Sequence, residues 1–404
     1  MNETITDSPQ TLRDQMVDRI TTAGWAHTSR VAEAMRAVPR HLFVPDATLA
    51  EAYDDRAVII KRGPDGKALS CASEPVIVAM MLDQLDIHPG HRVLEIGAGT
   101  GYNAALLAYL VGPTGQVTTV DIDPEVTAAA SRNLHITGYE QVHVATRDGA
   151  LGDPDHAPYD RIILTVGAWD IPTAWWDQLA PGGRLVVPLR WRGLTRSIAF
   201  DYTDGIMRSD SVHLCGFVPM LGQEGEHTGH LDPHHRVELC WDEDQHVEPP
   251  TLLGVLDQPQ TSAWSGVSVG AEESFDGIWL RLTATEPGTC RITATPDAID
   301  AGLLCRPAVP ARSPALVDGR SLAYLTLRRL TPEGAAASRW ELGAAAYGPA
   351  GVQLAERICD QIRAWNDART QQPVITAHPA NSPDSQPATG RSMDKHDIRL
   401  TVTY

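Results

Sequence analysis

Residues 66–75 (GKALSCASEP) place three potential nucleophiles in one short stretch of the chain. Ser70, Cys71 and Ser73 lie just before an apolar run with helical spacing. A hydroxyl or thiol can attack an electrophile when a base lies nearby, or it can orient a reacting group through a hydrogen bond. Which role applies depends on the ligand that the neighbouring segments bind.

A glycine-rich loop follows in VLEIGAGTGYNAALLA (93–108), where an apolar run ending near Glu95 leads into a helical pattern. Glycines at 97, 99 and 101 let the backbone approach a ligand closely. A dinucleotide-binding G-x-G-x-x-G loop needs its third glycine at position 102, where the chain has Tyr102. The E-x-G-x-G-x-G spacing is instead typical of the S-adenosylmethionine (SAM) loop of Rossmann-like methyltransferases.

Two more acidic residues follow the next strand-like runs. Asp121 ends the first, where a carboxylate can accept hydrogen bonds from both hydroxyls of a ribose. Asp148 follows the second and can accept from an adenine amino group, while Gly149 leaves room for the ring. A single aspartate at a strand end is usually a turn or cap residue. Together with Glu95, however, these acids at successive strand ends predict SAM as the cofactor.

The predicted cofactor contacts in this part of the chain are Glu95, Gly97, Gly99, Gly101, Tyr102, Asn103, Asp121, Ile122, Asp148, Gly149 and Thr165. For Asn103 two roles stay open, because it can cap the following helix or contact the carboxylate of the cofactor.

Strand and helix signals alternate through the first half of the chain. Nearly all-apolar runs such as RVLEIG, QVTTVDI, YDRIILTVG and GRLVVPL are separated by helical stretches such as NAALLAYLVG and PEVTAAASRNLHITG. Strands that are apolar on both faces argue for a parallel sheet covered on both sides. We therefore predict an α/β fold with a doubly wound, mostly parallel sheet, as in Rossmann-like SAM-dependent methyltransferases, over residues 1–225.

The pattern of strand and helix signals changes in the second half of the chain. We predict this half to be a separate α+β domain (226–404) with an antiparallel sheet. GIWLRLTAT, TCRITAT, SLAYLTLRRL and DIRLTVTY read as strands. GVQLAERICDQIRAW reads as a helix with one apolar stripe. Residues 368–393 are rich in Pro, Ser and Thr and are expected to form a long mobile loop.

The formal net charge of −18 over 404 residues bounds the possible partners. Phosphate backbones repel such a surface unless a basic patch intervenes, and the most basic stretch, RWRGLTR (190–196), is short. We predict no nucleic-acid partner. No run reaches the roughly 18 apolar residues of a membrane-spanning helix, and the acidic N-terminus is unlike a signal peptide. A cytoplasmic protein without a membrane partner is expected, and the sequence predicts no oligomeric state.

Several segments within residues 1–225 resemble protein-L-isoaspartate O-methyltransferases. They are VPRHLFVP (38–45), AYDDRAV (52–58), SEP (73–75), VLEIGAGTGYNAA, DGALGDPDHAPYDRIILTVGA, LAPGGRLVVP (179–188) and FVPMLG (217–222). The glycine loop alone is shared by many methyltransferases, whereas the first and last segments are specific. The resemblance implies methyl transfer from SAM to a side-chain carboxylate of a peptide.

That family carries a turn close to T-I-S-Q-P with an essential serine, which matches Ser73. Cys71 and Ala72 fall at the Thr and Ile positions, and Glu74 at the Gln. The resemblance implies that Cys71, Ala72 and Ser73 contact the cofactor and that Ser73 is catalytic. A carboxylate is already ionised at pH 7 and needs no general base, so Ser73 is expected to orient the acceptor rather than to attack.

The chain departs from the family pattern at the acceptor side. Glu74 puts a negative charge beside a pocket meant for a carboxylate, and Trp169 is bulky where repair enzymes carry small residues. We predict that both bind substrate. The extra residues 226–404 resemble those of tailoring methyltransferases of ribosomally made peptides, including lanthipeptides, where an Asp ester leads through succinimide to isoaspartate.

We therefore predict a tailoring enzyme whose C-terminal domain grips the peptide. General isoaspartate repair is the alternative, and a non-catalytic SAM- or peptide-binding module is a second one. An RNA base methyltransferase would share the cofactor loop but conflicts with the acidic composition.

Other features are assigned to structure. Histidines 227, 230, 234 and 235 are expected in an interdomain loop, with no metal, and the six cysteines include no C-x-x-C pair. Trp175 and Trp176 are expected to be packing residues, Ser70 a turn residue and Cys71 a filler beside the cofactor. Arg40 and His41 fit either a structural corner or a substrate clamp.

Overall fold

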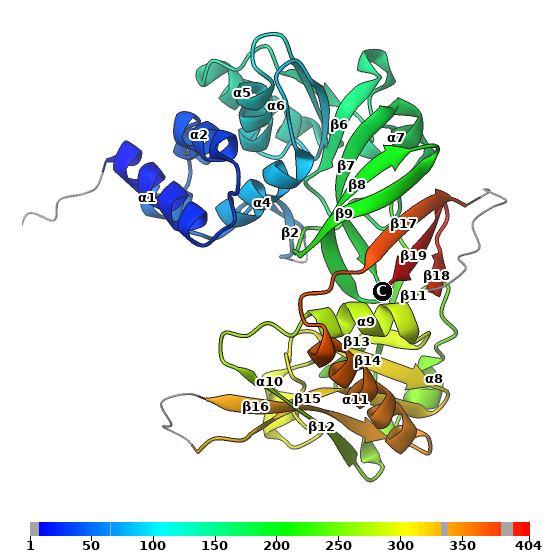
Figure 1. The fold of residues 1–404 in the computed structure, drawn as a ribbon. Coiled ribbons are helices and arrows are strands. Elements are labelled where there is room, and N and C mark those ends of the chain that lie inside the picture. Colours follow the sequence, from blue (N-terminus) through cyan, green and yellow to red (C-terminus); the bar gives the residue numbers. More distant parts are fainter. Residues whose placement is uncertain (1–7, 65, 333–337, 381–390) are drawn as a thin grey trace, which may run out of the picture. The chain divides into compact units, whose positions relative to one another are not determined.

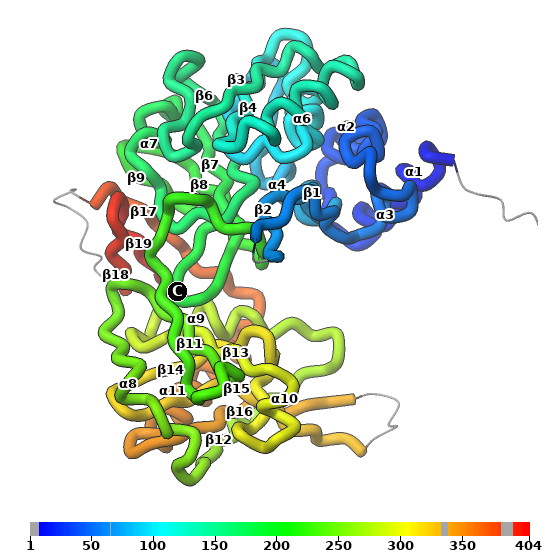
Figure 2. The backbone as a smooth tube through the Cα atoms, turned by 180° about the vertical axis from the view of Figure 1, so that it is seen from behind, coloured from blue at the N-terminus to red at the C-terminus, as the bar shows by residue number. Residues whose placement is uncertain are grey.

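The computed structural model describes residues 8–64, 66–332, 338–380 and 391–404. The chain forms two compact units (Figures 1 and 2). The first comprises Met1–Leu189 and Thr195–Gln223, and the second comprises Arg190–Leu194 and Glu224–Tyr404. The domain boundary expected at residue 225 stays a prediction, and each unit is described by itself.

The strands of the first unit form a mixed sheet in the order β9-β8-β7-β6-β3-β4-β5. Their bounds are β3 (Arg92–Ile96), β4 (Gln116–Asp121), β5 (His143–Thr146), β6 (Tyr159–Leu164), β7 (Leu179–Trp191), β8 (Leu194–Thr203) and β9 (Ile206–Leu214). The pairs β3–β4, β3–β6, β4–β5 and β6–β7 are parallel, and β8–β9 is antiparallel. The carboxyl ends of the central parallel strands therefore meet at one edge of the sheet.

The helices of the first unit pack on this sheet or on one another. They are α1 (Pro9–Thr22), α2 (Ser29–Ala37), α3 (Leu49–Tyr53), α4 (Pro75–Leu85), α5 (Tyr102–Val111), α6 (Pro124–Ile136) and α7 (Thr173–Gln178), with the short turns η1 (Arg40–Phe43), η2 (Gly149–Leu151) and η3 (Pro154–His156). Helix α4 packs on β6, α5 on β3 and β4, and α6 on β4 and β5. Trp175 and Trp176 of α7 are buried, which confirms their packing role. The α/β fold class predicted from the alternating pattern is confirmed.

Local sequence explains where these elements begin. Ser8 accepts a hydrogen bond from the Thr11 N–H at the start of α1, and Asp123 does the same for Glu125 at the start of α6. A separate hairpin, β1 (Val58–Arg62) with β2 (Ala68–Ala72), leads directly into α4.

The second unit contains an antiparallel sheet in the order β10-β11-β13-β14-β15-β16-β12. Its strands are β10 (Glu226–His230), β11 (Val237–Asp242), β12 (Thr261–Gly270), β13 (Thr289–Ala294), β14 (Ser313–Asp318), β15 (Ser321–Arg329) and β16 (Arg339–Tyr347). Three more strands follow the order β18-β19-β17, namely β17 (Val374–Pro379), β18 (Arg391–Asp394) and β19 (Ile398–Thr403). The predicted antiparallel α+β character is confirmed.

The helical elements of this unit are α8 (Pro249–Leu252), η4 (Val255–Asp257), α9 (Gly277–Thr285), α10 (Pro296–Asp300) and α11 (Gly351–Asp367). Leu354, Ile358, Ile362 and Trp365 of α11 are buried in one core cluster, as the apolar stripe predicts. No helix within the described ranges is long and apolar enough to cross a membrane.

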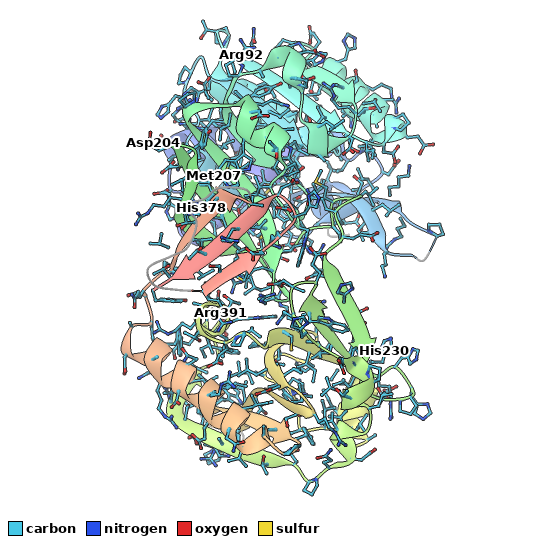
Figure 3. The ribbon with its side chains drawn as sticks, turned by 90° about the vertical axis from the view of Figure 1, so that its right-hand side faces the viewer. Arg92, Asp204, Met207, His230, His378 and Arg391 are labelled. Atoms are coloured by element: carbon cyan, nitrogen blue, oxygen red, sulfur yellow. The ribbon has the colours of Figure 1, made fainter. Side chains whose placement is uncertain are left out.

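Three expectations for the second half are wrong. GIWLRLTAT is helix α9 rather than a strand, and its Ile278 and Leu282 share the core with α11. Parts of the expected loop 368–393 are strands β17 and β18, while residues 381–390 lie outside the described part of the chain. His227 and His230 lie on β10 rather than in a loop (His230 is labelled in Figure 3).

Candidate active site

The glycine loop joins β3 to α5 at the carboxyl edge of the first unit's sheet. Gly97 has φ +103° and Gly99 has φ +51°, a region that residues with a Cβ rarely occupy. A Cβ on Gly97 would lie 2.5 Å from Thr165 Oγ1 at the end of β6. That hydroxyl donates to the Gly97 carbonyl at 2.5 Å, so the absence of a side chain lets β6 hold the loop against the sheet.

Glu95, the last residue but one of β3, is fully buried. Its two carboxyl oxygens accept hydrogen bonds from Thr119 Oγ1 (2.5 Å) and Asn103 Nδ2 (2.8 Å). Burial raises the pKa of Glu95 to about 7, although both hydrogen bonds act in the opposite direction. Asn103 therefore bonds this carboxyl group instead of capping α5.

Asp121 and Asp148 lie at the carboxyl ends of neighbouring strands. Asp121 is half-buried and accepts from the backbone N–H groups of Asp123 (3.1 Å) and Gly99 (3.4 Å). Burial raises the pKa of Asp121, with the hydrogen bonds from Asp123 and Gly99 opposing. Asp148 is exposed and accepts from the Ala150 N–H at 2.9 Å. Gly149 is packed so closely that a Cβ there would lie 2.5 Å from Ile96 Cγ2.

Two cavities adjoin at the glycine loop, because both are lined by Cys71, Gly97, Gly99 and Thr165. We call them the aspartate cavity and the serine cavity. The aspartate cavity is also lined by the predicted residues Asp121, Ile122, Asp148 and Gly149. The serine cavity is also lined by the predicted residues Ala72, Ser73, Glu95, Tyr102 and Asn103. The structure thus brings predicted residues from five segments of the first unit to one cleft.

The turn that carries Ser73 lies between the end of β2 and the start of α4. Ser73 is half-buried, and its carbonyl accepts a hydrogen bond from Arg40 Nη2 at 2.8 Å. Burial raises the pKa of the Cys71 thiol, which keeps the less nucleophilic protonated form. Ser70 lies within β2 and is not the turn residue that the sequence suggested.

Three predicted site residues do not line either cavity. Gly101 has φ +83° at the N-cap of α5, where a Cβ would lie 3.2 Å from the Ala130 carbonyl oxygen. Its glycine is therefore required by packing against α6. Glu74 follows Ser73 but is exposed at the N-cap of α4. Trp169 is only 3% exposed, and its backbone N–H donates to Gln223 Oε1 at 2.7 Å.

Sequence reasoning missed several residues of the cleft. Val218, Pro219, Met220 and Leu221 line the aspartate cavity, together with Lys61 and Leu69 of the β1–β2 hairpin. The segment 218–220 is fixed beside the end of β6, since Gly167 donates to the Val218 carbonyl (2.8 Å) and accepts from the Met220 N–H (3.0 Å). The motif FVPMLG signalled this segment, whereas nothing in the sequence signalled Lys61.

A protein-family model described as protein-L-isoaspartate(D-aspartate) O-methyltransferase matches residues 11–225. The chain belongs to this family. As a member of the isoaspartyl methyltransferase family, it is a SAM-dependent carboxyl O-methyltransferase.

Archaeal relatives support this membership. The chain is 44% identical over 215 residues to the protein-L-isoaspartate O-methyltransferase of Methanopyrus kandleri, covering 92% of that protein and 53% of this chain. It is 41% identical over 222 residues to the enzyme of that name from Hyperthermus butylicus, covering 90% of that protein and 53% of this chain. The aligned part thus amounts to about half of this isoaspartyl methyltransferase family member.

A solved structure named protein-L-isoaspartate O-methyltransferase resembles more of the fold. It matches with a TM-score of 0.50 at 21% sequence identity and covers 90% of this chain and 96% of that chain. At this identity the likeness supports the fold alone. The resemblance in fold nevertheless extends beyond residue 225.

The cleft of this member of the isoaspartyl methyltransferase family fits SAM. The half-buried carboxylate of Asp121 offers acceptors for ribose hydroxyls, and Ile122 and Leu221 offer apolar surface beside it for an adenine ring. Gly99 lies where the aspartate cavity and the serine cavity adjoin, and a Cβ there would be in van der Waals contact with the Cys71 carbonyl oxygen, at 3.6 Å.

Proposed function

We propose that the protein methylates the side-chain carboxylate of L-isoaspartyl residues in peptides and proteins, as a repair enzyme. The observation that carries the proposal is the match to relatives named for this activity, which covers 92% of one relative and 90% of the other. The residues of the cleft agree with it, because they suit a cofactor on one side of the glycine loop and a small polar acceptor on the other.

When bound, SAM supplies an activated methyl group on its sulfonium sulfur. Asp121 holds the ribose through its carboxylate, and Asp148 with Gly149 borders the adenine in the aspartate cavity. Gly97, Gly99 and Thr165 shape the floor between the two cavities. Glu95 and Asn103 border the amino-acid end of the cofactor in the serine cavity.

Ser73 orients the acceptor. An isoaspartyl carboxylate is ionised near neutral pH, so no side chain has to remove a proton. The Ser73 hydroxyl donates to one carboxylate oxygen and leaves the other free to meet the methyl group. Ile77, Met81 and Phe217 line the same cavity and restrict water there. The resulting methyl ester is attacked by the next backbone nitrogen of the substrate, which expels methanol and forms a succinimide.

The repair reaction is better supported than the tailoring of a ribosomally made peptide. The relatives from Methanopyrus kandleri and Hyperthermus butylicus carry the isoaspartyl name. The tailoring hypothesis rests on the presence of residues 226–404 and on Glu74 and Trp169, neither of which lines a cavity of the cleft. A role of this segment in gripping a peptide likewise stays a prediction.

Three peptides test the proposal on the full chain. A linear isoaspartyl hexapeptide, the same hexapeptide with ordinary Asp, and a cyclic Asp peptide are incubated with SAM and followed by mass spectrometry. We expect a gain of one methyl group on the isoaspartyl peptide, followed by a net loss of one water as the succinimide forms. Turnover of the cyclic Asp peptide alone would reverse the choice between repair and tailoring.

Ser73→Ala, compared with Ser70→Ala, tests the catalytic assignment. Ser70 lies on β2, three residues before Ser73, but lines the aspartate cavity. We expect Ser73→Ala to lower kcat by about 10- to 1,000-fold, as for loss of one positioned donor, while Ser70→Ala stays within a few fold. Calorimetric binding of S-adenosylhomocysteine should be nearly unchanged in both. Binding of that ligand by a wild-type chain that methylates none of the peptides would favour the non-catalytic module.

A further inference from the structure

A buried arginine lies next to the turn that carries Ser73. Arg40 of η1 is 0% exposed, which is unusual for a residue whose charge is costly to remove from water. Its guanidinium lies over the Tyr102 ring, 5.0 Å from the ring centroid. Among the ion pairs formed within the described ranges, none involves Arg40, so no carboxylate within 4.0 Å explains the burial of this cation.

The guanidinium instead donates to backbone carbonyls. Nε donates to Ala52 at 2.9 Å, and Nη2 donates to Ser73 at 2.8 Å and to Ala72 at 3.3 Å. These carbonyls come from α3 and from the turn after β2, two segments that are distant in sequence. Arg40 therefore ties the turn to the helical N-terminal part of the unit.

The two carbonyls at the turn have a specific geometric meaning. The Ala72 carbonyl belongs to the peptide plane before the Cα of Ser73, and the Ser73 carbonyl belongs to the plane after it. Because peptide units are planar, hydrogen bonds to these two carbonyls restrict φ and ψ of Ser73. The same arginine nitrogen thus restricts the direction in which the Cα–Cβ bond of Ser73 points.

The elements on either side of Ser73 do little to orient its backbone. β2 ends at Ala72 and α4 begins at Pro75, so Ser73 belongs to neither element. Pro75 has no N–H to donate, and the Glu74 carbonyl already serves the first turn of α4 by accepting from Ile77 and Val78. Nη2 carries two N–H groups in the rigid plane of the guanidinium, and it can therefore donate to both adjacent carbonyls.

We infer that Arg40 is a positioning residue for methyl transfer, which holds the Ser73 hydroxyl in the direction required to orient the acceptor carboxylate. This inference rests on the proposed role of Ser73. The sequence left two roles open for Arg40, a structural corner or a substrate clamp. The inferred role is a third one, because Arg40 acts on the substrate through the backbone of Ser73.

Arg40→Met and Arg40→Lys test this inference, with Arg30→Met as the matched control. Arg30 also donates to two backbone carbonyls, those of Ile87 (2.6 Å) and Leu110 (2.8 Å), but lines neither cavity. Loss of either arginine should lower Tm. Only loss of Arg40 should lower kcat, by about 10- to 100-fold as for a misplaced catalytic group, with KM changed much less. Arg40→Lys keeps the charge without the planar fork and should recover part of kcat.

A second readout is independent of turnover. Hydrogen exchange of the protein without ligand, followed by mass spectrometry over residues 70–78, should accelerate in Arg40→Met and stay as in the wild type in Arg30→Met. Wild-type exchange and kcat in Arg40→Met would overturn the inference, as would equal losses in the two variants. If the wild type failed on isoaspartyl peptides, the proposed function would fall, while the exchange comparison would still decide whether Arg40 holds the turn.

Discussion

The buried carboxyl group of Glu95 links the cofactor cleft to the pH dependence of stability. Its pKa is raised by burial to about 7 from an ordinary value of 4.5. Between these values the folded protein without ligand holds a proton that the unfolded chain has released. Its free energy of unfolding therefore decreases as pH rises from about 4.5 to about 7 and then levels off, by on the order of 3 kcal/mol at most.

Glu95→Gln should flatten this dependence, because the amide can keep hydrogen bonds to Thr119 and Asn103 without titrating. Urea unfolding at a series of pH values measures the effect. Glu33→Gln, which removes one exposed carboxylate from α2, is the control and should keep the wild-type slope. An unchanged slope in Glu95→Gln would show that the pKa of Glu95 is the same in the folded and the unfolded protein.

Glu74 gives a prediction for substrate binding. Burial and the neighbouring charge of Asp55 raise the pKa of Glu74. Once ionised, Glu74 repels an acceptor carboxylate held beside Ser73, so KM for an isoaspartyl peptide should rise as pH increases through this pKa. Glu74→Gln should lower KM severalfold above that pH and remove its pH dependence, with little change in kcat. Glu33→Gln serves again as the control, and equal KM values for both variants would contradict a role of Glu74 near the acceptor.

At the residue scale, the sequence was sufficient to place a residue at the cleft where that residue belongs to a contiguous motif. Gly97 follows β3 and Asp121 ends β4, and parallel strands bring their carboxyl ends together. Ser73 follows β2 of the antiparallel hairpin and lines the serine cavity. Trp169 is near β6 in sequence, but its chain turns toward Gln223 and buries the ring. Lys61 reaches the cleft from a hairpin whose position depends on tertiary packing, and no local pattern records that.

At the scale of elements, an ion pair joins two walls of the aspartate cavity. Lys61 of β1 contacts Asp123 (2.5 Å) and Glu125 (2.6 Å) at the start of α6, and both Lys61 and Asp123 line the cavity. These carboxylates raise the pKa of Lys61 to about 12, so the lysine stays charged at every pH at which the protein is assayed. These ion pairs join the β1–β2 hairpin to the start of α6 beside the aspartate cavity.

Lys61→Met should therefore speed the dissociation of S-adenosylhomocysteine by about two- to fivefold, the range expected for one partly exposed ion pair. Stopped-flow fluorescence measures the rate. Arg36→Met removes a comparable pair with Asp14 and Asp18 between α1 and α2 and should leave the rate unchanged. A wild-type dissociation rate in Lys61→Met would mean that the hairpin does not retain the ligand.

The sequence predicted helices and strands correctly where the apolar residues follow one period, either that of a helix or that of a strand. It did not do so where their spacing fits both periods. In GIWLRLTAT the apolar residues fit both periods, since Ile278, Leu280 and Leu282 alternate while Ile278 and Leu282 are also four apart. This segment forms helix α9, because the helical conformation lets Ile278 and Leu282 pack in one core with α11. In 368–393 the prolines suggested a loop, but Val374–Pro379 pairs with β19, and Pro379 needs no N–H at the strand's last position.

For the whole molecule, the division into units is less simple than a single cut. Arg190–Leu194 belongs to the second unit although the residues on both sides belong to the first. Arg192 is buried there and donates to Asp242 at 3.1 Å and to Asp244. A sequence pattern cannot predict that Arg190–Leu194 belongs to the second unit, because RWRGLTR resembles an exposed basic turn until its distant carboxylate partners are known.

The formal net charge of −18 predicts how the protein selects among substrates. An acidic molecule attracts basic peptides over distances that salt screens, with a Debye length of about 10 Å at 0.1 M ionic strength. Isoaspartyl peptides flanked by lysines should have a lower KM than peptides flanked by glutamates at low salt, with similar kcat. The ratio of the two KM values should approach one at high salt, and a neutral peptide should change least. A preference that is independent of salt would instead point to a specific contact near the acceptor, and Glu74→Gln would then show whether that contact is Glu74.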